Sequence, residues 1–312
     1  MNKDIMKQTN LPLIVAVSAR TLFNMEDGHA IYEKEGQAAF DKYNFKKRKT
    51  PLRPGLAANL VQKLIKLNSD GVTRVKLVIL SRNSTTAAMR VMSSIQHYGW
   101  DNAIESAIFC QGSDRYRYAR EIGVDLFLSA THADVEKAIA NGVSAATVVP
   151  KETNLLEAND PSLIKFAFDF DGILANKSAD DIYLAKGLEA FQASELENAE
   201  VPLEDGPMMN LLAKLNVLQK SFPNGKSPLN IAIVTARGVK VYERVYNTLS
   251  KRGVGVDEAI FAGGMPKGPL LKAYGADFFF DDVKKNIDSA HSCDIPSGHV
   301  PFGDGMGIVT AA

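Results

Sequence analysis

Short runs of apolar residues alternate along the chain with longer segments in which apolar residues recur at helical spacing. The runs typical of buried strands are residues 13–17, 76–80, 107–109 and 126–128 in the first half, and 164–168, 230–234, 259–261 and 278–280 in the second. Residues 56–67 and 208–220 predict helices; Leu56, Leu60 and Leu64, for example, fall on one helical face. Strands that alternate with helices favour an α/β fold built on a parallel, doubly wound sheet.

The second half of the pattern repeats the first at a nearly constant distance. Pairs in the first part of each half are separated by 151 positions (182 − 31, 187 − 36, 214 − 63), and pairs further on by 152 (260 − 108). The matching pairs are Ile31-Tyr32 with Ile182-Tyr183, Gly36 with Gly187, Lys63-Leu64 with Lys214-Leu215, and Ile108-Phe109 with Ile260-Phe261. One unit repeated twice explains this spacing. We therefore predict an internal duplication, with domains at residues 1–155 and 156–312.

Polar residues stand at or just beyond the C-terminal ends of the predicted strands in the second half. They are Asp169 and Asp171 after residues 164–168, Thr235 after 230–234, Lys267 in a Gly/Pro-rich loop, and Asp281 and Asp282 after 278–280. Ligands bind at this edge of open α/β sheets. Carboxylates that different strands deliver there can hold a hard cation, and one of them can be a nucleophile. The pattern indicates a metal-dependent phosphoryl-transfer enzyme.

Phosphate monoester hydrolysis needs a nucleophile, a proton for the leaving group and charge neutralisation. We expect Asp169 to attack phosphorus and form an aspartyl-phosphate, and Asp171 to act as general acid and base. Thr235 would offer its hydroxyl to a phosphate oxygen, and Lys267 would neutralise the phosphate. Lys272, five residues further on, is the alternative to Lys267.

The same strand ends predict a magnesium site. Mg²⁺ prefers octahedral oxygen ligands and few protein carboxylates. Asp169, the backbone carbonyl of Asp171 and one of Asp281 and Asp282 would supply the protein ligands. Asp281 and Asp282 could equally cap the following helix. Asn286, four residues after Asp282, is either a supporting partner of this site or a solvated helix residue.

The first half lacks this acidic set. Superposing the copies places Asp169 on Ser18, Asp171 on Arg20, Thr235 on Ser81, Lys267 on Arg115, and Asp281-Asp282 on Ser129-Ala130. The carboxylates are therefore expected to serve chemistry, and the first half is expected to be a degenerate copy without metal. Arg20 contacts a nucleotide or effector, or else forms a salt bridge within its own half.

Composition removes several classes of partner. The 36 basic and 36 acidic side chains balance, which gives no electrostatic argument for nucleic acid or a membrane surface. The two cysteines, Cys110 and Cys293, are too few for a disulfide framework. Neither a signal peptide nor a transmembrane run is visible. We expect a soluble, cytoplasmic protein that binds a small-molecule substrate.

The ordered motifs resemble those of the haloacid dehalogenase (HAD) superfamily and, over nearly the whole chain, the cytosolic 5′-nucleotidase type I family. The segments that carry the resemblance are Ala16-Val17-Ser18-Ala19-Arg20-Thr21, Phe168-Asp169-Phe170-Asp171, Val234-Thr235-Ala236-Arg237, Gly264-Met265-Pro266-Lys267-Gly268-Pro269 and Phe279-Phe280-Asp281-Asp282. The resemblance implies two tandem Rossmann-like, HAD-type parallel-sheet units. It also implies a small cap inserted near residues 175–204 and a homo-oligomeric assembly.

In function, the resemblance implies Mg²⁺-dependent hydrolysis of nucleoside 5′-monophosphates, with AMP and pyrimidine deoxynucleotides as substrates. The chain departs from vertebrate members at Phe170, where they carry Gly; this leaves the nucleophile unchanged and bears on substrate preference. Two alternatives remain open. The same chemistry could act on another small phosphomonoester as a phosphatase or phosphotransferase, or the protein could be a nucleotide-sensing regulator.

Overall fold

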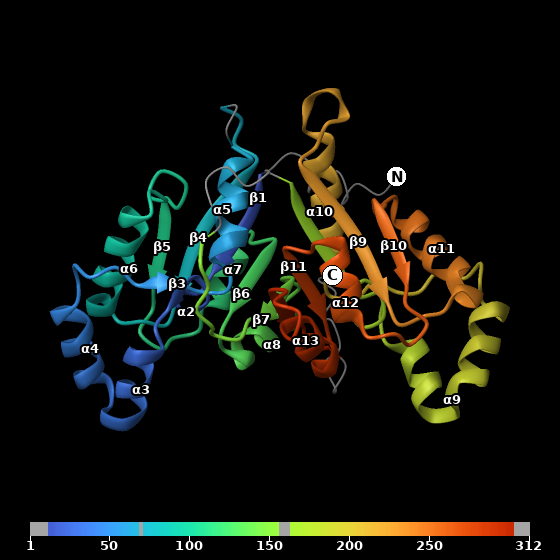
Figure 1. Ribbon diagram of the computed structural model, residues 1–312, viewed down its shortest axis with the longest axis horizontal. Helices are drawn as coiled ribbons and strands as arrows, with labels where there is room; N and C mark the ends of the chain where they lie inside the picture. Colours follow the sequence, from blue (N-terminus) through green and yellow to red (C-terminus); the bar gives the residue numbers. More distant parts are fainter. Residues whose placement is uncertain (1–11, 69–70, 156–162, 303–312) are drawn as a thin grey trace. The chain divides into compact units, whose positions relative to one another are not determined.

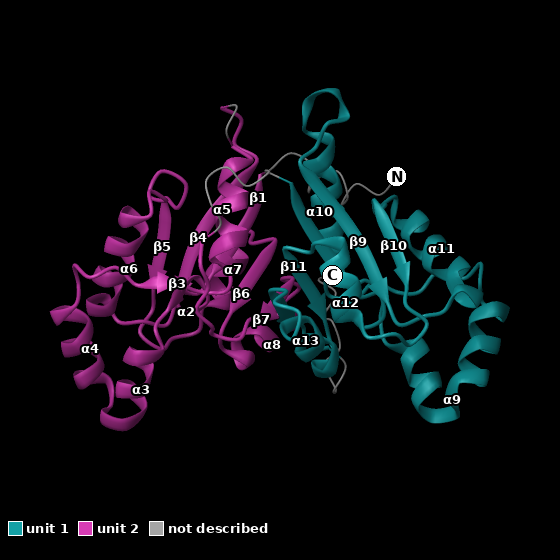
Figure 2. Cartoon of the chain, viewed as in Figure 1, with its two compact units in different colours: residues 1–11, 163–312 teal, residues 12–162 magenta. Residues whose placement is uncertain are grey.

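The computed structural model describes residues 12–68, 71–155 and 163–302. The chain divides into two compact units, shown in Figure 2: unit 2 contains residues 12–162, and unit 1 contains residues 163–312 together with 1–11. The first ten residues, in which no signal peptide is expected, and residues 156–162 at the expected boundary lie outside the described residues.

Unit 2 is built on five parallel strands in the order β5-β4-β1-β6-β7. The strands are β1 (Leu13–Val17), β4 (Val75–Ser81), β5 (Ser106–Phe109), β6 (Leu126–Ser129) and β7 (Ala145–Thr147). Its helices are α2 (Ala19–Leu22), α3 (Glu26–Glu35), α4 (Gln37–Lys46), α5 (Ala58–Lys66), α6 (Thr85–His97), α7 (Tyr116–Ile122) and α8 (His132–Ala140). Two short strands, β2 (Phe23–Asn24) and β3 (Arg53–Pro54), pair antiparallel beside this sheet.

Unit 1 has five parallel strands in the corresponding order, β10-β9-β8-β11-β12. The strands are β8 (Ile164–Phe168), β9 (Leu229–Thr235), β10 (Glu258–Phe261), β11 (Phe278–Asp281) and β12 (Ser297–His299). Its helices are α9 (Ser178–Glu197), α10 (Met209–Lys220), α11 (Tyr242–Arg252), α12 (Lys267–Tyr274) and α13 (Lys284–His291), with short 3₁₀ turns η1 (Pro223–Gly225) and η2 (Val239–Val241).

The predicted strands are all present, and each begins and ends within one residue of its expected position. Their apolar side chains form the core of each unit, and in unit 1 the Phe168 and Phe280 rings stack with centroids 5.1 Å apart. The fifth strands, β7 and β12, were not expected. They are three residues long and consist of Ala, Ser, Gly, Thr and His, so they lack the apolar run from which a buried strand is predicted. The α/β fold with parallel sheets is confirmed.

An insertion follows the first strand of each unit. In unit 2 it contains α3 and α4, joined at Gly36 (φ 80°); in unit 1 it is α9, which is broken at Gly187 (φ 82°). Both glycines adopt the left-handed conformation that other residues avoid, and each turns the chain between two helical segments. Figure 1 shows both insertions beyond the ends toward which the strands of their own unit point. The unit 1 insertion lies in the residue range where a small cap was expected.

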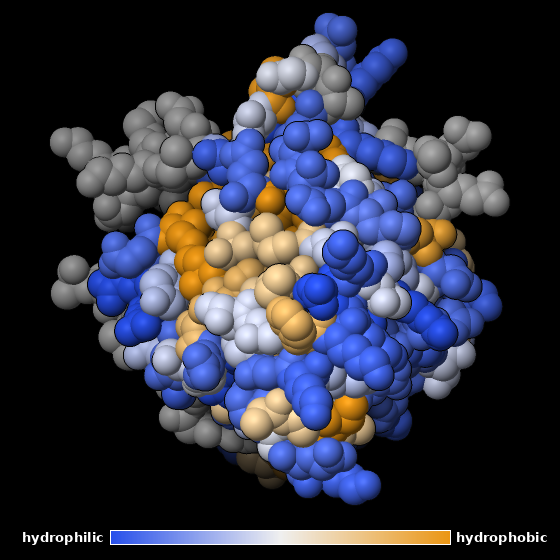
Figure 3. Space-filling view, turned by 90° about the vertical axis from the view of Figure 1, so that its left-hand side faces the viewer, coloured by the Kyte–Doolittle hydropathy of each residue, from blue (hydrophilic) through white to orange (hydrophobic). Residues whose placement is uncertain are grey.

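The face of unit 2 that Figure 3 shows is largely hydrophilic and includes a hydrophobic area. On α6, Met89 and Met92 are 47% and 41% exposed, while Val91 and Ile95 are buried. This helix therefore packs in the amphipathic manner that its sequence suggests. Among the described residues, no helix is long and apolar enough to cross a bilayer.

Candidate active site

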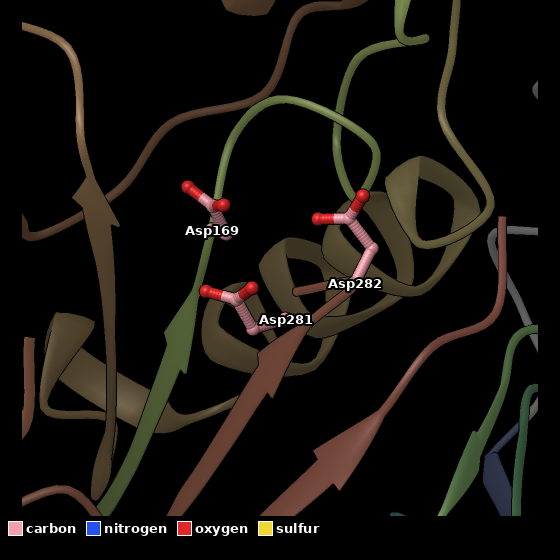
Figure 4. A group of neighbouring side chains, drawn as sticks. All are labelled: Asp169, Asp281 and Asp282. Atoms are coloured by element: carbon pink, nitrogen blue, oxygen red, sulfur yellow. The ribbon is translucent and has the colours of Figure 1, made fainter. Parts of the chain in front are cut away.

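Three carboxylates meet at the C-terminal ends of two adjacent strands of unit 1. Asp169 follows β8 directly, and Asp281 and Asp282 stand at the end of β11, which pairs with β8 in parallel register. One oxygen of each carboxylate lies within 4.8 Å of the other two. Figure 4 shows the three side chains projecting from these strand ends toward a common space. The strand register thus brings together residues more than a hundred positions apart in the sequence.

Lys267 lies between two of these carboxylates. Its Nζ atom is 2.8 Å from Asp169 Oδ1 and 2.8 Å from Asp281 Oδ2, and the side chain is buried. Lys267 is the first residue of α12 rather than part of a loop, so the helix start fixes where its side chain begins. Lys272, the alternative, is exposed in the last turn of the same helix. The structure therefore favours Lys267 as the lysine of this site.

Asp281 is held by donors on the segment that follows it. The backbone N–H of Val283 donates to its Oδ1 at 2.7 Å, and Asn286 Nδ2 lies 3.1 and 3.0 Å from the two carboxylate oxygens. Asn286 is thus a supporting partner and not simply a solvated helix residue. These bonds orient Asp281 while leaving its contact with Lys267 in place.

Asp282 has fewer partners than its burial demands. Lys177 Nζ lies 2.8 Å from its Oδ2, but Oδ1 is buried and has no hydrogen-bond donor among the described residues. Gly172 packs directly against this carboxylate: a Cβ atom there would lie 2.4 Å from Asp282 Oδ2, and its φ of 70° suits glycine. A buried carboxylate oxygen without a donor is a suitable ligand for a cation.

Asp171 lies in a different set of contacts. Arg237 donates from Nε and Nη2 to the two oxygens of Asp171, both at 2.7 Å, and it also pairs with Glu195. The Arg237 guanidinium stands 5.1 Å from the centre of the Phe170 ring. The carboxylate of Asp171 is therefore separate from the three-carboxylate group, and its predicted metal contact is through the backbone carbonyl.

Thr235 ends β9, the strand that pairs with β8 on the side away from β11. Its hydroxyl accepts the backbone N–H of Arg237 at 3.2 Å, and the side chain is 1% exposed. This bond ties the end of the strand to the bend that follows it.

The electrostatics of the site reflect crowded, buried charge. Burial raises the pKa of Asp169 well above its usual value, while Lys267 opposes that rise. Burial likewise raises the pKa of Asp282, against the effect of Lys177. Burial acts to lower the pKa of Lys267, but Asp169 and Asp281 outweigh it and the net pKa is raised. The carboxylates thus lack a full complement of positive charge.

Four charged residues of the site were not expected from the sequence. Lys177, Asp180 and Glu195 come from the inserted segment, and Arg237 follows Thr235 by two positions. Burial, together with Asp171 and Asp282, raises the pKa of Asp180 to about 7. Arg237 could have been found by the rule that identified Asp171, since Arg237 follows Thr235 by two positions as Asp171 follows Asp169. The insertion residues gave no signal, because charged residues are ordinary on short helices.

Arg20 lies in unit 2, directly after β1, and pairs with Glu26 through Nε at 2.7 Å and Nη2 at 2.8 Å. A salt bridge within its own half was one of its two expected roles. Arg20 also lines a cavity of about 660 Å³ in unit 2.

Comparison with known proteins identifies the same family that the sequence motifs resemble. Human (Homo sapiens) cytosolic 5′-nucleotidase 1B is 29% identical over 290 residues, which cover 89% of this chain and 47% of the relative. The chain therefore spans about half the length of this curated relative. A solved structure described as "Structure of Pnkp1/Rnl/Hen1 complex" matches over 94% of this chain and 97% of its own, with 15% identity and a TM-score of 0.33. The family model for 5′-nucleotidase matches residues 5–306, almost the entire chain, and the protein therefore belongs to the 5′-nucleotidase family.

Proposed function

We propose that this protein is a Mg²⁺-dependent 5′-nucleotidase that hydrolyses nucleoside 5′-monophosphates to nucleoside and phosphate. The observation that carries the proposal is the group formed by Asp169, Asp281 and Asp282, with Lys267 between two of its members, in a member of this family. The substrate class follows the relative's name, cytosolic 5′-nucleotidase. A cytoplasmic location and a homo-oligomeric state belong to the same proposal.

The residues present fit a hard divalent cation. All three donors are carboxylates, and Asp282 Oδ1 is buried without a donor among the described residues. Asp169, Asp282 and the backbone carbonyl of Asp171 would hold the ion, with Asp281 as the alternative or additional carboxylate. Bound there, Mg²⁺ would neutralise charge on the phosphoryl group during transfer.

Asp169 is the nucleophile in this proposal. Lys267 and the backbone N–H of Phe170 both contact its Oδ1, at 2.8 and 2.7 Å, which fixes the carboxylate and leaves Oδ2 as the oxygen that we assign to attack on phosphorus. The product of this step is an aspartyl-phosphate. Lys267 favours the ionised form of Asp169 that a nucleophile needs and opposes the rise in its pKa that burial causes.

Asp171 supplies the proton to the leaving ester oxygen and then accepts one from the water that hydrolyses the aspartyl-phosphate. Both of its oxygens accept from Arg237, so the side chain turns from Arg237 toward substrate to perform these transfers. We propose that Arg237 positions Asp171 between turnovers. Thr235, at the neighbouring strand end, donates its hydroxyl to a phosphate oxygen.

The shared strand order of the two units supports a further part of the proposal, that they arose by internal duplication. The break at Gly36 and at Gly187, 151 positions apart (187 − 36), supports it as well. In this proposal unit 1 is catalytic and unit 2 is the copy without metal.

The test is phosphate release from a panel of nucleoside 5′-monophosphates and sugar phosphates, with Mg²⁺ and with chelator, beside Asp169→Asn. Turnover of the nucleotides that needs Mg²⁺ and disappears in the variant is the expected result. Turnover of sugar phosphates in their place would keep the chemistry and overturn the substrate class. Activity that persists in Asp169→Asn would overturn the assignment of the nucleophile.

A further inference from the structure

The cavity in unit 2 lies at the C-terminal ends of its strands, where unit 1 carries its carboxylates. Ser18 follows β1, Ser81 ends β4 and Ala130 follows β6, and all three line it. Its volume of about 660 Å³ falls within the range of small-molecule sites. Ligands of open α/β sheets bind at this edge, and the unit therefore keeps a binding position even though the acidic residues are missing.

The wall of this cavity is basic. Arg20, Arg82, Arg115, His29 and His132 line it, and none of the described lining residues is Asp or Glu. Four carboxylates stand behind the wall. Glu26 pairs with Arg20, and Asp134 pairs with Arg115 and lies 3.7 Å from Arg82. Glu33 and Glu136 lie 3.2 and 3.4 Å from His29 and His132. The three guanidinium groups thus share two carboxylates, and the groups that reach the cavity itself are the basic ones. Arginine is well suited to bind phosphate through paired N–H donors.

Arg115 gives an independent indication of a ligand. Its side chain is 2% exposed; Nη1 donates to the carbonyl of Leu80 and Nη2 to Ser129 and Asp134. A further donor, Nε, is buried and has no acceptor among the described residues. Buried N–H groups are nearly always paired, so an acceptor is missing beside Arg115. An anionic oxygen of a ligand in the cavity would accept the hydrogen bond from Arg115 Nε.

The other wall is apolar and aromatic. Met25, Tyr32 and Phe40 line it, and the His29 and Tyr32 rings stack with centroids 6.2 Å apart and planes 11° apart. Flat rings beside a basic wall suit a ligand with a planar organic part and an anionic group. We propose that unit 2 binds a nucleoside phosphate in this cavity, through its arginines and without a metal ion.

The cavity is a binding site and not a second catalytic centre. At the strand ends where unit 1 carries Asp169 and Asp281, unit 2 carries Ser18 and Ser129. In the described part of the chain, the only acidic cluster able to hold a metal is that of unit 1. No carboxylate at the unit 2 strand ends could therefore accept a phosphoryl group.

The test is calorimetric titration of the full chain in chelator with three probes: AMP, inorganic phosphate and adenosine. Without metal, the acidic site of unit 1 repels anions, so binding reports on unit 2. AMP is expected to bind with one site per chain and more tightly than adenosine. Arg82→Gln and Arg20→Gln, both at partly exposed residues, should each weaken AMP binding about tenfold, as expected for a lost charge-assisted contact. Circular dichroism verifies that each variant is folded.

Two control variants separate this site from the rest of the molecule. Arg120→Gln removes an exposed arginine of α7 outside the cavity, and Thr235→Ala changes the phosphate residue of unit 1; neither should alter metal-free binding. The proposal fails if AMP does not bind metal-free protein, or if adenosine binds as tightly as AMP. It fails equally if Arg82→Gln and Arg20→Gln bind like wild type, or if Thr235→Ala abolishes binding. None of these results depends on whether the protein is a hydrolase.

Discussion

The carboxyl ends of the strands carry opposite charge in the two units, although the strands follow one order in both. Unit 1 gathers Asp169, Asp281 and Asp282 there, while unit 2 presents Arg20 and Arg115. The sheet forms in both cases, so its stability does not require the acidic residues. The difference teaches that the apolar strands and helices build the edge, and that a few side chains decide whether the edge attracts a cation or an anion.

The two units also hold their buried charges differently. In unit 2, Arg115 and Asp134 form a compact pair between α7 and α8. In unit 1, Arg237 joins Asp171 to Glu195, and Lys267 joins Asp169 to Asp281, so each cation serves two carboxylates. Unit 1 is therefore short of positive charge, which is the condition that favours a bound metal ion.

The largest expected effect is on catalysis and comes from a substitution at the acidic edge of unit 1. Asp169→Asn should lower nucleotide hydrolysis by about a thousandfold or more, because an amide cannot form the acyl-phosphate. Asp101→Asn, an exposed aspartate in a turn of unit 2, is the matched control and should keep activity. The measurement is steady-state phosphate release with Mg²⁺. Equal rates in both variants would mean that the acidic edge of unit 1 is not where the reaction occurs.

The second prediction concerns stability. Arg237→Gln leaves Asp171 as a buried carboxylate without its cation and Glu195 with Arg244 alone, and should lower the free energy of unfolding by about 3–5 kcal/mol. Arg252→Gln removes a partly exposed pair with Asp205 and should cost less than about 1 kcal/mol. Urea denaturation followed by circular dichroism measures both. A small effect of Arg237→Gln would mean that Arg244 compensates Glu195 and that Asp171 does not depend on Arg237 for its burial.

The third prediction tests whether a metal ion binds at the acidic strand ends of unit 1. Mg²⁺ at about a hundred times its Kd should stabilise the protein by about 2.7 kcal/mol, seen as a higher melting temperature. Asp282→Asn should remove most of this shift, because it neutralises a buried carboxylate of the group. Asp288→Asn, exposed on α13, should keep it. A shift that survives in Asp282→Asn would place the ion elsewhere.

The smallest expected effect tests the packing behind Asp282. Gly172→Ala forces a Cβ atom to 2.4 Å from Asp282 Oδ2 in a backbone with φ 70°, and should cost about 1–3 kcal/mol and weaken Mg²⁺ binding. Gly253→Ala, with φ 65° and open space around it, isolates the backbone term of about 1 kcal/mol. Thermal melts with and without Mg²⁺ compare the two. Unchanged Mg²⁺ affinity in Gly172→Ala would mean that Asp282 can move without loss.

The strands were predictable because each is a buried apolar run whose period and length are local properties of the chain. The short strands β7 and β12 were not, since three residues with little apolar character depend on a neighbouring strand for their hydrogen bonds. The site followed a similar division. Asp169 and Asp281 were predictable from their place after β8 and β11, whereas Glu195, on a helix far along the chain, becomes a site residue only when α9 folds beside Arg237.

The sequence by itself therefore determined the α/β class, the parallel strands and the identity of the acidic strand-end residues. Apolar periodicity and the position of polar groups after strands depend only on residues that are close together in the chain. Only the tertiary structure decided which charges pair. In the folded chain, Lys267 lies between Asp169 and Asp281, and Asp171 pairs with Arg237. Arg115, which lines the basic cavity, has no acceptor for its Nε among the described residues. These pairings depend on the distances between segments that are far apart in the chain and on how deeply each charged group is buried. Both quantities set the electrostatic energy of a charged group.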